Sequence, residues 1–191
     1  MVAPDVGVWY PGGMLKRLLP GLAALSVATG AFAAAPPKPA PKPAAKPAGA
    51  AFDARDPASL IALLATMDAK AEVARKDTDS VYLNVATPGF SFGVQYVGCN
   101  AEGKACQGVA FSTAAGTKTA TLVQLNAFNQ TSVTCRVFQD KAGKAHVAYS
   151  TLLSSRDSRD EMKTHLGAWQ GCLGSFGQFL TDPNGYLASA P

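Results

Sequence analysis

The fold is decided by residues 158–181, SRDEMKTHLGAWQGCLGSFGQFLT. Ser158 followed three residues later by Glu161 is typical of a capping box at the start of a helix. Apolar residues then recur at alternating spacings of four and three, which is the pattern of one helix face. These are Met162, Leu166, Trp169, Leu173, Phe176 and Leu180. The sequence therefore predicts a long amphipathic helix, limited by Pro183, with one face against a core.

Upstream of this helix, apolar residues alternate with small or polar ones, as expected for strands with one buried face. The first three runs are Val81, Leu83, Val85; then Phe90, Phe92, Val94, Tyr96; then Val109, Phe111. Two later runs are Val133, Cys135, Val137 and Ala145, Val147, Tyr149. Turn residues at 88–89, 100–103 and 140–144 separate neighbouring runs, so we expect an antiparallel meander and a hairpin.

Two shorter helices complete the prediction. Asp56-Pro57 is a capping residue followed by a first-turn proline, and it starts a predicted helix at 57–68 with Leu60, Ile61, Leu64 and Met67 on one side. A second helix is predicted at 119–129, with Leu122, Leu125 and Phe128 in one stripe. The order is helix, three or four strands, helix, two strands and a long helix. The predicted class is α+β, an antiparallel sheet of about five or six strands with helices mainly on one face.

The beginning of the chain is predicted to direct export. Residues 14–33 combine Lys16 and Arg17 with an apolar run that ends in Ala31-Phe32-Ala33, which is the pattern of a cleaved signal peptide. We expect the mature protein to begin near Ala34 and to be periplasmic or secreted. Residues 1–13 fit no part of a signal peptide, so we favour Met14 as the true start; the alternative is a genuine, longer leader.

Residues 34–51 hold six of the thirteen prolines and three lysines, Lys38, Lys42 and Lys46. This composition is typical of an extended linker, with at most weak association with anionic envelope components. Of 17 Lys and Arg, five precede residue 51, and of 13 Asp and Glu, one does, which leaves twelve of each. The predicted domain, residues 52–183, is therefore neutral, which argues against nucleic-acid binding. Residues 184–191 are predicted to be a tail.

The four cysteines are an even number in a chain predicted to be exported, which favours disulfides. Cys99 and Cys106 flank a six-residue loop between two predicted strands, so we favour this pair. Cys135 and Cys172 would then join a strand to a flank of the long helix; the alternative for Cys135 is a small buried apolar residue. The Cys-x6-Cys spacing does not match zinc ligands, and we expect neither a metal nor a cofactor.

No catalytic constellation is recognisable in the sequence. His146 is predicted on the outer face of a strand and His165 on the flank of the long helix. The nucleophile, zinc-protease and phosphate-loop motifs are absent. Asn126 and Asn129 are candidates for a ligand, but we favour a helix-ending role in which they satisfy backbone groups. We therefore predict that the protein is not an enzyme.

Two surfaces are candidates for contact with a partner. Gly167, Gly171 and Gly174 fall within about 60° of each other on the long helix, where another backbone could approach closely; the alternative is a tolerated face of small residues. The second surface is the polar face of the predicted sheet. It comprises Ser91, Gln95, Thr134, Arg136, His146 and Ser150.

In two long stretches the chain resembles the YbjN family of putative bacterial sensory-transduction regulators. These are GVQYVGCNAEGKACQGVAF at 93–111 and LNAFNQTSVTCRVFQDKAGKAHVAYSTLL at 125–153, followed by the long helix with spaced aromatics. The resemblance covers about residues 57–181. It implies a fold similar to type III secretion chaperones and a protein-binding scaffold, with no catalytic residue to transfer. The predicted export signal departs from cytoplasmic members of the family.

We therefore expect a noncatalytic envelope protein, a chaperone-like or regulatory module that binds an unidentified protein partner or a second copy of itself. Two other functions are considered. One is a small periplasmic hydrolase with an unrecognised site, and the other is a stress-related structural protein without a dedicated ligand.

Overall fold

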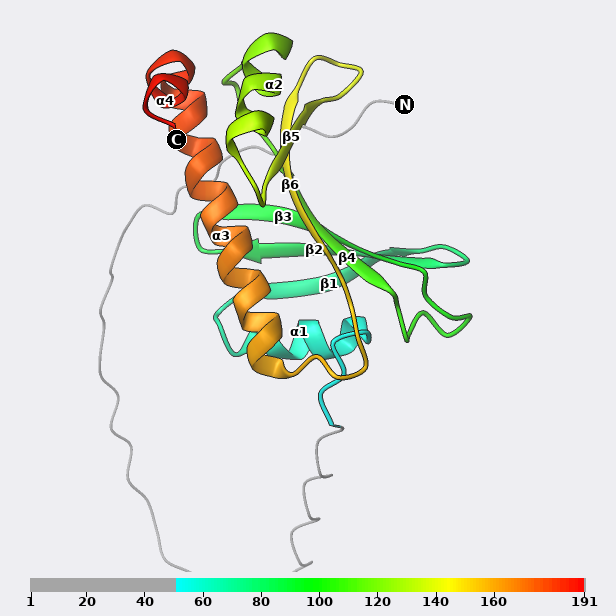
Figure 1. The fold of residues 1–191 in the computed structure, drawn as a ribbon. Coiled ribbons are helices and arrows are strands. Elements are labelled where there is room, and N and C mark those ends of the chain that lie inside the picture. The colour runs from blue at the N-terminus through cyan, green and yellow to red at the C-terminus, as the bar shows by residue number, and fades with distance from the viewer. Residues whose placement is uncertain (1–50, 191) are drawn as a thin grey trace, which may run out of the picture. The chain divides into compact units, whose positions relative to one another are not determined.

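The computed structural model describes residues 51–190, so the predicted leader, signal peptide and most of the linker lie outside the described residues. Six strands and four helices follow one another along this part (Figure 1). They are α1 (Pro57–Ala65), β1 (Lys70–Lys76), β2 (Ser80–Thr87), β3 (Phe90–Val97), β4 (Gly108–Ala114), α2 (Leu122–Thr131), β5 (Arg136–Gln139), β6 (Ala145–Leu152), α3 (Arg159–Thr181) and α4 (Pro183–Ser189). The predicted α+β class with an antiparallel sheet is confirmed.

The strands form one antiparallel sheet in the order β1-β2-β3-β4-β6-β5. Pro88 and Gly89 join β2 to β3, and Gly89 has a φ of 123°, which favours glycine. The β5–β6 hairpin closes where the Asp140 N–H donates to the carbonyl of Lys144 over 2.9 Å. β4 and β6 are neighbours although α2 and β5 lie between them in sequence. The sheet therefore joins the meander to the later hairpin.

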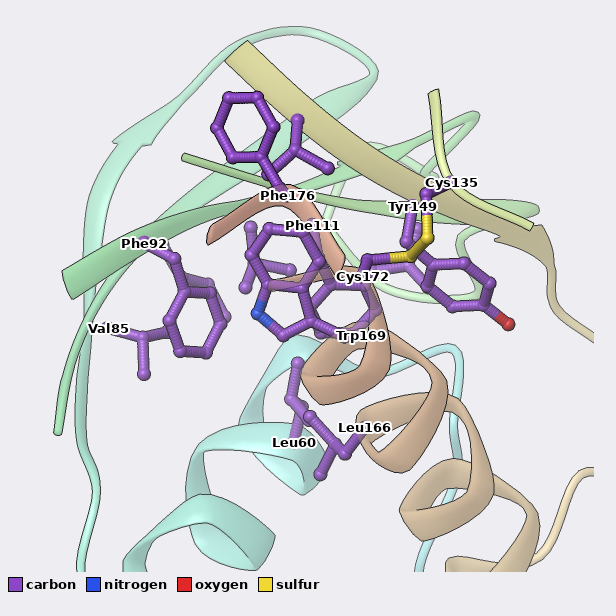
Figure 2. Close-up of a cluster of buried hydrophobic side chains, with 14 of the residues drawn as sticks. Leu60, Val85, Phe92, Phe111, Cys135, Tyr149, Leu166, Trp169, Cys172 and Phe176 are labelled. Atoms are coloured by element: carbon purple, nitrogen blue, oxygen red, sulfur yellow. A yellow bond between two sulfur atoms is a disulfide. The ribbon is translucent and has the colours of Figure 1, made fainter. Parts of the chain in front are cut away.

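The core lies between one sheet face and the helices α1 and α3. Trp169 of α3 packs against Phe92 and Phe111, with ring centroids 5.6 and 6.2 Å apart, while Leu60 and Leu166 lie on its other side (Figure 2). All five side chains are buried. Because each fully buried large apolar side chain contributes roughly 1.5–3 kcal/mol, this layer accounts for much of the stability of the domain.

The buried stripe of α3 differs from the predicted one. Cys172 and Phe179 are fully buried, whereas Leu173 and Leu180 are only partly buried. Cys172 is drawn inward by its disulfide with Cys135. Phe179 packs on Phe128 of α2, at 5.0 Å between ring centroids. Tertiary contacts, and not helical periodicity alone, therefore set which face of α3 is inside.

Three other predictions at the ends of elements were wrong. Helix α1 ends at Ala65, so Met67 lies outside it and is exposed. Leu122 occupies the exposed first turn of α2. Val133 is 93 % exposed and precedes β5, because the hydroxyl of Ser132 accepts the Cys135 N–H and forms a turn there.

Strand β1 had no specific prediction, and helix α4 lies, apart from its first residue, in residues that were predicted only to be a tail. β1 has the sequence KAEVARK and is exposed along nearly all its length, so it carries no alternation of buried residues. α4 begins with the Asp182 side chain accepting the Gly185 N–H over 3.0 Å. Among the helices of residues 51–190, none has both the length and the hydropathy that a membrane span requires.

Candidate functional site

The candidate site is the sheet face that points away from α1 and α3, here called the open face. Strand register places its residues in rows across the sheet, since paired antiparallel residues share a face. One such row contains Glu72, Asn84, Gly93, Ser112, Ala148 and Arg136. No helix of the described part covers this face. Both Arg136 and His146, which were predicted to contribute to a contact surface, belong to it.

The floor of the open face is made of small residues. Gly93, Ala110, Ser112, Ala114 and Ala148 lie on three neighbouring strands, and each is partly exposed. A hollow of about 700 Å³ lies over one part of this floor, at Gly93, Ser112 and Ala114, with Lys70 and Glu72 at one side and His146 at the other. Small side chains thus leave space that longer ones would fill.

One wall of the hollow is built by the β5–β6 hairpin. His146 stacks on Phe138, with ring centroids 5.0 Å apart, and its Nε2 lies 2.9 Å from Oδ2 of Asp140. Hydrogen bonding to His146, and then to the backbone N–H groups of Lys144 and Ala142, holds the pKa of Asp140 below its usual value. The hairpin turn and the wall are therefore one hydrogen-bonded unit.

The opposite wall comes from β1 and β2. The guanidinium of Arg75 lies over the Tyr82 ring at 4.0 Å and also pairs with Asp77 at 3.1 Å. Gln95 donates to the Tyr82 hydroxyl over 2.9 Å. Lys70 and Glu72 are exposed and form no ion pair within residues 51–190.

The far end of the open face is apolar. Val97 and Leu152 are 40 % and 84 % exposed and flank Gly108. A Cβ at Gly108 would lie 3.3 Å from the carbonyl oxygen of Thr151 and 3.4 Å from Val97. Gly108 therefore lets the two aliphatic side chains converge at this end.

The outer edge of β5 is occupied by a side chain. Asn129 of α2 donates from Nδ2 to the carbonyl of Val137 over 2.9 Å and accepts the Val137 N–H at Oδ1 over 2.8 Å. Asn129 therefore satisfies backbone groups, but those of the neighbouring strand, and it does not end its helix, since α2 continues to Thr131. Asn126 is exposed.

The four cysteines are joined in two disulfides. Cys99 and Cys106 close the loop between β3 and β4, and Cys135 joins the segment before β5 to Cys172 of α3 (Figure 2). These are the two pairs considered from the sequence. Both disulfides are compatible with an oxidising, extracytoplasmic location.

The two predicted contact surfaces lie apart. Gly167, Gly171 and Gly174 are exposed on α3, and a Cβ built on any of them meets nothing within 4 Å. They face away from the sheet, whereas Arg136 and His146 lie on the open face. Thr134 of the predicted polar face precedes β5 and has no strand partner.

The histidines do not converge on one site. His165 Nδ1 lies 2.6 Å from the Tyr149 hydroxyl, on the core side of β6, while His146 lies on the open side. Burial raises the pKa of Tyr149. Within residues 51–190 no hydroxyl is hydrogen-bonded to His146, and no group of three or more His, Cys, Asp or Glu is arranged to hold a metal ion.

Alternation in the sequence marks Gly93, Ser112, Ala148 and Phe138 as outward positions, but it does not show the hollow over the small residues or the apolar end of the face at Leu152. Alanine, glycine and serine carry little periodic signal of their own, and Leu152 lies beyond the predicted alternation of its strand, which ends at Ser150. The signal that could have found them is the pairing register, since residues two apart on each predicted strand share a face.

One family model matches most of the described domain. It is YbjN, described as "Putative bacterial sensory transduction regulator", and it matches residues 56–179. No curated protein and no solved structure gives a significant match.

Proposed function

The chain belongs to the YbjN family, and from this membership we propose that it is an exported, noncatalytic module that binds a protein partner in the cell envelope. Its role is chaperone-like or regulatory, in keeping with the regulator description of the family. The binding surface is the open face.

The observation that carries this proposal is the uncovered, hollowed sheet face. Antiparallel sheets often expose one polar face to water, but here a hollow of about 700 Å³ with Gly93, Ser112 and Ala114 in its floor lies between Lys70 and Glu72 on one side and His146 on the other. His146 stacks on the exposed ring of Phe138. Val97 and Leu152 add exposed aliphatic surface. Concave surfaces that combine apolar area with a few polar groups are typical of binding sites.

Export is supported by two independent features. Residues 14–33 have the charge, apolar run and small-residue end of a signal peptide. The four cysteines of the domain are all joined in disulfides, a usage typical of oxidising compartments. The proline-rich residues 34–51 would then act as a spacer in front of the domain.

Photocrosslinking in intact cells tests the binding role. A crosslinking amino acid replaces Ala148 or Ser150 on the open face, and Gln170 on the exposed side of α3 is the matched control. We expect crosslinks to one envelope protein from the open-face positions and none from the control. Equal labelling at all three positions, or no protein crosslink from any of them, would reject the proposal.

A hydrolase is a second candidate, which the pairing of His146 with Asp140 beside the hollow favours. A general base of this kind needs an acidic partner and a nucleophile. Hydrolysis of ester or peptide substrates by the purified domain, abolished in His146→Ala and retained in His165→Ala, would favour it over a binding module.

A further inference from the structure

We propose that the open face binds an amphipathic helix of a partner protein and does not bind an extended strand. This inference rests on the proposed binding function, and it names the mode of binding and the shape of the partner segment. It follows from the hydrogen-bonding state of the sheet edges, the form of the floor and the unpaired charges.

Strand addition requires a sheet edge with free backbone groups. At β5, the Asn129 side chain already bonds both backbone groups of Val137. At β1, the register with β2 shifts between Val73 and Arg75, and this bulge interrupts a strand that carries Lys70, Glu72 and Lys76. Bulges and charged side chains are two devices that discourage edge pairing. Neither edge therefore favours an added strand.

A segment that lies across the face of a sheet receives no backbone hydrogen bonds from it, because strand N–H and C=O groups point along the sheet. An extended segment there would leave its own backbone groups without partners as it covered Val97, Leu152 and Phe138. Each such buried group costs about 1–3 kcal/mol. A helix satisfies these groups internally, so it can cover the apolar area without this loss.

The open face, measured along β6, is about as long as a short helix. From His146 to Leu152 along β6 there are six residue steps, which at about 3.3 Å each give roughly 20 Å. A helix of about 13 residues has the same length, at a rise of about 1.5 Å per residue. The opposite face of the same sheet already packs against a helix, α3, through Trp169.

The positive charge of Arg136 on the open face predicts an acidic side chain in the bound helix. Arg136 is exposed and donates from Nη1 to the carbonyls of Ser132 and Cys135, which orients its guanidinium. Arg136 forms no ion pair in the described domain. We expect the partner helix to present an aliphatic stripe to Val97 and Leu152 and an acidic side chain to Arg136.

Crosslinked peptides from the intact-cell experiment test the binding mode. With the photocrosslinker at Ala148 or Ser150, mass spectrometry locates the partner residues that are labelled. A helix gives labelled residues three or four apart, whereas a strand gives residues two apart. A spacing of two between the labelled partner residues would overturn the helix and leave the binding function standing. Labelling from Ala74 of β1 in place of the open face would overturn both the helix and the open face as the binding surface. Labelling of a second copy of this chain would overturn the stated partner.

The labelled segment, made as a synthetic peptide, provides the second test. We expect Ala148→Trp and Ser150→Trp to weaken its binding to the mature domain at least about tenfold, and Ala62→Trp on the exposed side of α1 to leave it unchanged. Ser150 is exposed, so its variant fills the face without entering the core. A proline at the centre of the peptide should abolish binding; unchanged affinity would overturn the helix. If no open-face position labels any protein, the binding function fails as well.

Discussion

The side chain of Asn129 binds both backbone polar groups of Val137, at 2.9 Å to the carbonyl oxygen and 2.8 Å from the N–H. A single amide from α2 thus takes the place of a further strand beside β5. The contact connects the position of α2 to the pairing of the β5–β6 hairpin, and it removes one of the two edges at which the sheet could grow.

Replacing this amide should destabilise the domain. Asn129→Ala leaves two partly buried backbone groups of Val137 without partners, so the free energy of unfolding should fall by about 1–3 kcal/mol. Urea denaturation of the mature domain measures the change. Asn126→Ala, at an exposed position on the same helix, is the control, and equal midpoints for the two variants would contradict the edge-closing role.

The two disulfides should differ in their effect on stability. In the chain-entropy model, a bond across 37 residues contributes about 4 kcal/mol and a bond across 7 residues about 2.4 kcal/mol. Cys135→Ala with Cys172→Ala should therefore lower the urea midpoint more than Cys99→Ala with Cys106→Ala. Trp169 reports the transition, because the other tryptophan, Trp9, precedes the predicted cleavage site. A lower urea midpoint for the Cys99/Cys106 double variant than for the Cys135/Cys172 double variant would contradict the larger contribution of the Cys135–Cys172 disulfide to stability.

Alanine should be tolerated at all three exposed glycines of α3. A Cβ at Gly167, Gly171 or Gly174 meets nothing within 4 Å, and alanine gains about 0.5–1 kcal/mol over glycine inside a helix. The triple variant should melt at a higher temperature and keep its crosslinking from Ala148. Loss of crosslinking or a change of oligomeric state would instead support a close contact at these glycines.

The β5–β6 hairpin should weaken in acid. The pKa of Asp140 is lower in the folded than in the unfolded chain, so its hydrogen bonds stabilise the fold above about pH 4 and are lost as the pH falls through the folded-state value. The difference in melting temperature between wild type and Asp140→Asn should be largest near neutral pH and vanish in acid. Asp68→Asn, at an exposed turn, controls for the change in net charge, and a constant difference across pH would contradict this role.

Much of the fold follows from local pattern. Val81, Leu83 and Val85 alternate along β2, and Ser158 with Glu161 caps α3 as their spacing predicts. β1 could not be predicted from this pattern, because an exposed edge strand shows no alternation of buried residues. Phe179 is buried because α2 and α4 pack beside it, which helical periodicity does not show.

The candidate site is less accessible to sequence reasoning. Arg136 and His146 could be assigned to one polar face from alternation alone. The hollow could not, because it depends on the register that aligns Gly93 with Ser112 and Ser112 with Ala148. The same holds for Asn129, whose partner is eight residues away and is reached only after the chain reverses.

Export into an oxidising compartment is the claim on which the disulfides, the location and the envelope partner all depend. Its most direct measurement is the intact mass of the protein from fractionated cells whose thiols were alkylated before lysis. We expect a periplasmic or secreted protein that begins near Ala34 and carries no alkylated cysteine. A cytosolic protein that retains residues 14–33 and has four alkylated cysteines would contradict it.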